Sequence, residues 1–96
     1  MIQSFADTTT ADLFRERNTT AARRIPRDVW PVVQRKVKML DVAARIDDLV
    51  SPAGNRLKAL KGRMRGRCSI RVNQQYGIAC RWENGNAFEV AIEDYH

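Results

Sequence analysis

The sequence is poor in the residues from which metal sites and disulfide frameworks are built. Its 96 residues include one histidine and two cysteines, and no Cys-x-x-Cys motif occurs. Cys68 and Cys80 lie far from His96 along the chain, so the spacing typical of zinc ligands is absent. We therefore expect no metal ion or other cofactor, and we interpret both cysteines as small buried residues of a reduced compartment.

Long apolar runs are also missing. No stretch approaches the roughly 18 apolar residues that a membrane-spanning helix needs. The opening MIQSFADTTT has neither a basic start nor an apolar run, so we expect no secretory signal. These absences predict a cytoplasmic protein without a membrane partner, and the length predicts one domain over residues 1–96.

Acidic residues are absent from one long stretch. The chain has 17 lysines and arginines against 11 acidic residues, for a net charge of +6. Between Leu49 and Trp82 no acidic residue occurs. The basic residues of that stretch are Arg56, Lys58, Lys61, Arg63, Arg65, Arg67, Arg71 and Arg81. Positive charge segregated in this way favours a polyanion such as nucleic acid over a merely solvated surface.

The first third of the chain is predicted to hold a short strand and a helix. The strand can begin within residues 2–5, and Asp7 or Thr8 can cap a helix that runs to about Arg17. Residues 18–27 lack apolar periodicity and contain a proline, which indicates a loop.

A second helix is predicted after this loop. Asp28 can cap it, with Trp30 and Pro31 in its first turn, where a proline is tolerated. Its end is expected between Arg45 and Val50, before a turn that contains proline and glycine. The apolar stripe at helical spacing is Val29, Val33, Val37, Leu40 and Ala44.

After Gly54 the apolar pattern changes to the two-residue alternation of strands. Half-buried strands are expected over residues 67–73, 76–83 and 87–93, with a short or irregular edge strand near residues 57–60. The side chains predicted to face the core are Cys68, Ile70, Val72, Tyr76, Ile78, Cys80, Trp82, Phe88, Val90 and Ile92. The connections are too short for crossovers, which predicts an antiparallel meander.

The last connection poses a problem of register. The inward-facing residues predicted for residues 76–83 and for residues 87–93 all have even numbers. They lie on the same face only if each even-numbered residue pairs with another even-numbered one, so that the two numbers have an even sum. Trp82 would then oppose Phe88, and Cys80 would oppose Val90. A two-residue Asn84-Gly85 turn gives odd sums and would put the sets on opposite faces. We therefore expect a three-residue loop over residues 84–86 or a β-bulge.

These elements predict an α+β domain in which helices cover one face of the sheet and the other face stays open. The side chains expected on the open face are Arg67, Arg71, Arg81, Glu89, Glu93 and Tyr95.

Four stretches of the chain carry a family resemblance. They are MIQSF, KMLDVAARIDDLVSPAGNRLKALKG, SIRVNQQYGIACRW and the terminal VAIEDYH. In this order they resemble the RelE/HigB-like toxins of bacterial toxin–antitoxin systems over nearly the whole chain, apart from residues 8–30. The resemblance implies a RelE-like fold, with a short N-terminal strand and two helices on one face of a mainly antiparallel sheet of four to five strands.

The resemblance also implies a function. Such toxins are endoribonucleases that cut messenger RNA, typically in the ribosomal A site. The ribose 2′-OH attacks the neighbouring phosphate without a metal ion. The implied partners are mRNA and ribosomal RNA on the ribosome and a HigA-like helix-turn-helix antitoxin, through which alone operator DNA would be contacted.

The catalytic residues that the resemblance implies lie mainly at the C-terminus. Asp94, Tyr95 and His96 match the family's terminal DYH. His96, the single histidine, is the natural proton carrier near neutral pH. Asp94 could orient it, and Tyr95 could stack on a base or hold the phosphate. Which residue is general base and which general acid stays open, and the alternative is an ordinary polar tail.

The basic residues divide into two predicted roles. Lys58 stands where some family members carry a second catalytic histidine and others a glutamate; a lysine can hold the phosphate but is a poor base near pH 7. Together with Arg71 it completes the predicted catalytic set. The predicted RNA-binding residues, which fix position and not sequence, are Arg56, Lys61, Arg63, Arg65, Arg67 and Arg81.

Two positions depart from the family pattern. The family usually reads N-x-x-W-R-I where this chain has Tyr76, Gly77 and Ile78, and its arginine projects towards the scissile phosphate. Met64 also stands where a basic residue is common. Gly77 fits either a naturally attenuated toxin or an inactivating substitution that lets cells survive expression. The second is favoured because nothing else in the strand looks adapted to glycine.

Two functions from other classes remain as alternatives. One is a catalytically impaired protein that binds RNA or the ribosome, or that acts with the antitoxin in repression. The other is a general RNA-binding module. The latter is disfavoured because no aromatic side chain other than Tyr95 is expected on the open face to stack unpaired bases.

Overall fold

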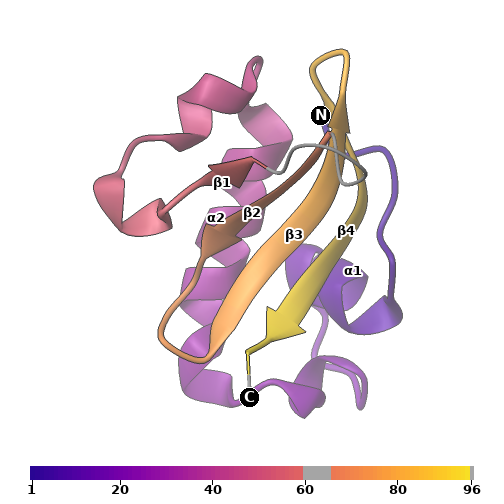
Figure 1. Cartoon of the computed structure of the whole chain (residues 1–96). Coiled ribbons are helices and arrows are strands. Elements are labelled where there is room, and N and C mark those ends of the chain that lie inside the picture. The colour runs from indigo at the N-terminus through magenta and orange to yellow at the C-terminus, as the bar shows by residue number, and fades with distance from the viewer. Residues whose placement is uncertain (60–65, 96) are drawn as a thin grey trace.

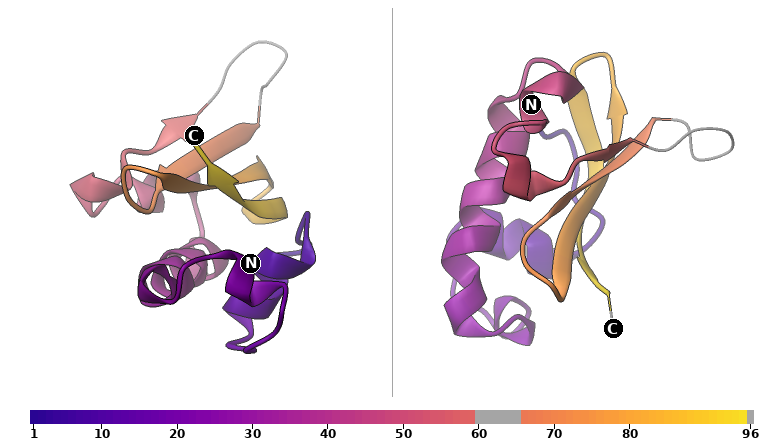
Figure 2. Two further views of the ribbon diagram at one scale, coloured as in Figure 1. Left: turned by 90° about the horizontal axis from the view of Figure 1, so that it is seen from below. Right: turned by 60° about the vertical axis from the view of Figure 1, so that its left-hand side comes forward.

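The computed structural model describes residues 1–59 and 66–95. Within these residues four strands form one sheet, in the order β1-β2-β3-β4, and every neighbouring pair is antiparallel. The helices and strands are α1 (Thr8–Phe14), α2 (Trp30–Val42), β1 (Lys58–Ala59), β2 (Arg67–Arg71), β3 (Tyr76–Glu83) and β4 (Asn86–Asp94). Both helices lie on one side of the sheet (Figures 1 and 2), which confirms the predicted α+β architecture.

The N-terminal segment runs beside β4 before α1 begins. Ile2 and Phe5 form isolated parallel bridges to β4, so the predicted N-terminal strand is reduced to two contacts. The side chain of Asp7 accepts a hydrogen bond from the Thr10 N–H at 2.7 Å, which confirms it as the cap of α1. The helix ends at Phe14, earlier than expected, and Glu16 has left-handed backbone geometry with φ 57°.

The start and end of α2 differ from the prediction. A 3₁₀ turn over Arg27–Val29 leads into the helix, and no side chain caps it, so the predicted Asp28 cap is wrong. Instead the Trp30 indole N–H donates to the Ile25 carbonyl at 2.8 Å and holds this end in place. The helix ends at Val42, and the extended backbone that follows buries Ala43 in place of the predicted Ala44.

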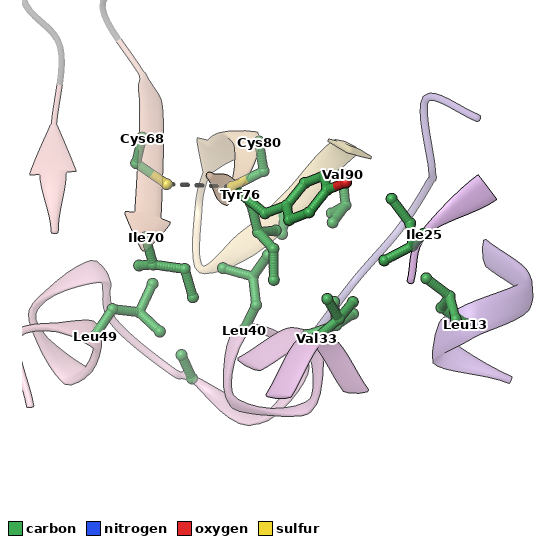
Figure 3. Close-up of a cluster of buried hydrophobic side chains, with 14 of the residues drawn as sticks. Leu13, Ile25, Val33, Leu40, Leu49, Cys68, Ile70, Tyr76, Cys80 and Val90 are labelled. Carbon is green, nitrogen blue, oxygen red and sulfur yellow. Dashed lines mark hydrogen bonds between the residues drawn. The ribbon is translucent and has the colours of Figure 1, made fainter. Parts of the chain in front are cut away.

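The core lies between α2 and the covered face of the sheet. Figure 3 shows Val33 and Leu40 pointing from α2 towards Ile70, Tyr76 and Val90 of the strands, all of them buried. This confirms most of the predicted inward set, and Trp82 and Ile92 are partly buried against the same cluster.

The two cysteines are neighbours across β2 and β3. Cys68 pairs with Cys80 in the register, both are buried, and their sulfur atoms lie 3.2 Å apart (Figure 3). The hydrogen bond between them, together with burial, raises the pKa of the Cys80 thiol above its ordinary value. Both thiols therefore belong to the core, as the sequence predicts.

The connection between β3 and β4 is a two-residue turn followed by a β-bulge. Asn84 and Gly85 both have positive φ, 51° and 79°, as a type I′ turn requires. The register changes between the pair Ala79–Ala91 and the pair Arg81–Phe88, where one residue of β3 faces two of β4. The bulge alternative is thus confirmed, and the three-residue loop is not formed.

The bulge also corrects one predicted core residue. Trp82 pairs with Ala87, which is fully buried, and Phe88 pairs with Arg81 on the open face. The guanidinium carbon of Arg81 lies 4.5 Å from the centre of the Phe88 ring. Phe88 is therefore not an inward-facing residue, because the extra residue at Glu89 reverses the alternation of β4 between its two halves.

The packing of α2 makes a testable prediction. Leu40→Ala is expected to lower the free energy of unfolding by about 2–5 kcal/mol, because it leaves a cavity under the sheet. The matched control is Val42→Ala on the same helix, where the side chain is 68% exposed and little should change. Chemical denaturation monitored by tryptophan fluorescence measures both, and equal effects of the two substitutions would contradict this core.

Candidate nucleic-acid interface

Three rows of side chains cross the open face, and the strand register defines each of them. The rows are Arg67, Arg81 and Phe88 (the arginine row); Lys58, Ser69, Ala79 and Ala91 (the small row); and Arg71, Gly77 and Glu93 (the glycine row). Neighbouring rows are two residues apart along β2, or roughly 7 Å. Four of the predicted cations, Lys58, Arg67, Arg71 and Arg81, thus share one face with small residues.

Tyr95 covers the glycine row. Its backbone N–H donates to the Gln75 carbonyl at 2.7 Å, which fixes the chain just after β4. A Cβ atom at position 77 would lie 1.9 Å from the Tyr95 hydroxyl oxygen and 2.6 Å from its Cζ atom. The Arg71 guanidinium carbon lies 5.5 Å from the centre of the same ring. Tyr95 therefore rests on the backbone of Gly77 with Arg71 beside it.

This contact changes the interpretation of Gly77. The neighbouring chain end is fitted to a glycine, an adaptation that the sequence of the strand alone did not reveal. Any larger side chain at position 77 requires the Tyr95 ring to move. The ring is 45% exposed, so it can swing towards solvent without disturbing the core.

The other C-terminal residues have different surroundings. Asp94 pairs in register with Tyr76, whose side chain is buried in the core, so strand alternation places Asp94 and Tyr95 on opposite sides of β4. The Gln75 side chain donates to Asp94 at 3.4 Å. The predicted site residues His96, Lys61, Arg63 and Arg65, like Met64, lie outside the described residues.

A buried polar pair supports the segment that carries Arg56 and Lys58. Asn55 is fully buried, and its amide donates to the carbonyls of Leu49 and Ser51 at 3.1 and 3.4 Å. Its Oδ1 accepts a hydrogen bond from the ammonium of Lys36 on α2. Asn55 thereby ties the segment before β1 to the second helix.

Lys36 is an unexpected core residue. Only 7% of it is exposed, and burial, followed by the nearby charge of Arg35, lowers the pKa of its ammonium. The sequence signal was present, since Lys36 lies three residues after Val33 and four before Leu40, on the buried stripe. Lys36 was nevertheless not among the residues predicted for the core.

Of the predicted RNA-binding residues, the structure describes Arg56, Arg67 and Arg81. Arg56 has left-handed geometry, with φ 44°, at the end of the 3₁₀ turn that contains Asn55, and its side chain is exposed. Arg67 pairs with Glu89 at 2.9 Å, and Arg81 pairs with Glu83. These ion pairs are partly exposed, so they orient the arginines and add little stability.

Residues 1–59 and 66–95 contain neither a group of metal ligands nor a membrane-spanning helix. No three His, Cys, Asp or Glu side chains in these ranges gather where they could hold a metal ion. No helix in the same ranges is long and apolar enough to cross a membrane.

The helix-covered antiparallel sheet and its cationic open face define an α+β domain of the RelE-like class. Residues 3–96 match the family model of the RelE-like toxin of the type II toxin–antitoxin system HigB. Over 73 residues, 76% of this chain and 77% of the relative, the sequence is 38% identical to Toxin HigB-1 of Vibrio cholerae serotype O1. An uncharacterised protein of Haemophilus influenzae is 32% identical over 72 residues, 75% of this chain and 71% of that protein.

The chain therefore belongs to the HigB-like toxin family. It is a toxin of a type II toxin–antitoxin system, a class that pairs each toxin with an antitoxin. Toxins of this family are in general ribonucleases.

The buried pair makes a prediction about the scaffold of this face. Asn55→Ala is expected to lower the free energy of unfolding by about 1–3 kcal/mol, because it leaves the Lys36 ammonium buried without its acceptor. In a Lys36→Met background the same change should cost less. Denaturation of the four proteins of this double-mutant cycle measures the coupling, and an equal cost in both backgrounds would show that the pair is not linked.

Proposed function

We propose that this toxin is a ribosome-dependent endoribonuclease that cleaves mRNA in the A site by metal-independent attack of the ribose 2′-OH. The observation that carries this proposal is the convergence of Lys58, Arg71 and Tyr95 on one open face lined by small residues. Small side chains leave room for a phosphate to approach the cations, and the covered face is filled by the core.

The proposed chemistry assigns a role to each group. The attacking 2′-OH loses its proton to a base, the leaving 5′-oxygen gains one from an acid, and cations stabilise the charged phosphorane. Arg71 and Lys58 serve as the cations, Tyr95 holds or stacks the substrate, and His96 transfers protons. Asp94, on the opposite side of β4 from Tyr95, contributes by orienting His96. General acid–base catalysis supplies about 10²–10⁴-fold, and one preorganised charge stabiliser about 10²–10³-fold.

The partners in this proposal are RNA on the ribosome and an antitoxin. Arg56, Lys61, Arg63, Arg65, Arg67 and Arg81 bind mRNA and ribosomal RNA in this proposal. A HigA-like helix-turn-helix antitoxin holds the toxin inactive and provides the contact with operator DNA. The site of action is the ribosome in the cytoplasm.

Gly77 attenuates the enzyme in this proposal. An arginine at position 77 would start from the centre of the glycine row and reach a phosphate held by Arg71. In its place Tyr95 rests on the glycine. This contact also favours the second candidate function, a catalytically impaired protein that binds the ribosome or acts with the antitoxin in repression.

Growth arrest on induction separates the two functions. Gly77→Arg is expected to arrest growth more strongly than the present chain, by at least ten-fold in surviving colonies, because it restores a phosphorane-stabilising charge. The same variant truncated after Asp94 should lose the arrest, because Tyr95 and His96 are removed.

The control variant adds the same side chain elsewhere. Apart from its chain neighbours, no atom lies within 4 Å of the position that a Cβ atom would take at Gly54. Gly54→Arg therefore adds the same charge as Gly77→Arg, but outside the glycine row. Arrest by Gly54→Arg equal to that of Gly77→Arg would reduce the effect to net charge. A folded Gly77→Arg protein that leaves growth unchanged would overturn the nuclease assignment in favour of the binding protein.

A further inference from the structure

The arginine row contains an aromatic platform that the strand alternation alone does not predict. Phe88 reaches the open face only because the bulge reverses the alternation of β4. Its ring is partly exposed and lies beneath the Arg81 guanidinium, whose central carbon is 4.5 Å from the ring centre. The guanidinium is therefore supported on one side by an aromatic ring.

The charges around this platform nearly cancel. Arg81 is paired with Glu83, and Arg67 is paired with Glu89 at 2.9 Å. A phosphate entering here would meet two carboxylates together with two guanidinium groups. A planar group without net charge meets no such repulsion, and the Glu83 contact helps to hold the Arg81 plane in place.

The position of the platform also suits an extended strand of RNA. It lies two rows from the glycine row, about 13 Å along β2. Between them, on β2, β3 and β4, stand Ser69, Ala79 and Ala91, whose short side chains leave the path over these strands clear. Lys58 belongs to the same row but lies at its edge, on β1. A phosphate held at Arg71 therefore leaves a neighbouring nucleotide within reach of Arg81.

We propose that the guanidinium plane of Arg81, supported by Phe88, stacks an unpaired nucleobase of single-stranded RNA next to the cleavage site. Unpaired bases stack on arginine planes as well as on aromatic rings. This subsite rests on the proposed function for the identity of its ligand as RNA. It acts in substrate binding and takes no part in proton transfer.

The test uses the full chain and an RNA that cannot be cleaved. A short single-stranded oligonucleotide with 2′-O-methyl riboses carries 2-aminopurine, whose fluorescence falls when the base stacks. Titration with the present chain should quench the probe. Phe88→Leu and Arg81→Lys should each weaken the quenching interaction about 5- to 100-fold, since stacking contributes about 1–3 kcal/mol per base.

Two further measurements make the result specific. Phe88→Tyr keeps the ring and should retain quenching, and the same probe placed in a duplex should not respond. Arg81→Lys keeps the charge and changes only a partly exposed side chain, so it tests the stack even if Phe88→Leu folds poorly.

The outcomes separate this subsite from the nuclease assignment. Absence of quenching by the present chain, or quenching that Arg81→Lys leaves unchanged, would overturn the stacking site. Neither result depends on cleavage, because the probe lacks a free 2′-OH. Conversely, a Gly77→Arg protein that fails to arrest growth would leave the quenching result intact.

Discussion

The β-bulge at Glu89 is the constraint on which the open face depends. The Asn84-Gly85 turn is a tight type I′ hairpin, and by itself it would place the apolar residues of β3 and β4 on opposite faces. One extra residue in β4 reconciles the turn with the core, so that both Ala87 and Val90 are fully buried. The N-terminal segment satisfies the irregular backbone, since Ser4 accepts hydrogen bonds from the N–H groups of Glu89 and Val90. The same irregularity delivers Phe88 and Glu89 to the face that carries the arginines.

The other end of this face depends on how closely two chain segments approach. Tyr95 lies on Gly77 because the absence of a side chain there leaves the backbone accessible, and the Gln75 carbonyl holds the Tyr95 backbone. The buried pair of Lys36 and Asn55 fixes the segment that leads into β1 and Lys58. This end of the cationic face therefore depends on two contacts. The hydrogen bond between Lys36 and Asn55 in the core fixes the segment before β1, and the Tyr95 ring covers Gly77 on the open side.

Much of this arrangement could be predicted from the sequence. The two-residue alternation after Gly54 predicted the strands and the meander, and the helical stripe of Val33, Val37 and Leu40 predicted the packing of α2. The register of the hairpin predicted that either a β-bulge or a three-residue loop was needed to bring the apolar residues of both strands to one face. It could not tell which of the two forms, because either one adds the residue that the register requires. Phe88 was therefore placed on the wrong face. Lys36 was not included in the predicted core, although it lies on the buried stripe of α2. The contact between Tyr95 and Gly77 was missed because it joins the chain end after β4 to β3, a packing that strand alternation alone does not predict. The catalytic roles of Lys58, Arg71, Asp94, Tyr95 and His96 stay predictions.

The most direct test of the central claim is to map the ends of mRNA in a reconstituted translation reaction, with the present chain and with Gly77→Arg. Attack by the 2′-OH must leave a 2′,3′-cyclic phosphate on the upstream fragment. We predict such ends in ribosome-bound mRNA, abundant with Gly77→Arg and sparse with the present chain, and none when ribosomes are omitted. Intact mRNA with a folded Gly77→Arg protein would contradict the assignment of this open face as a nuclease site.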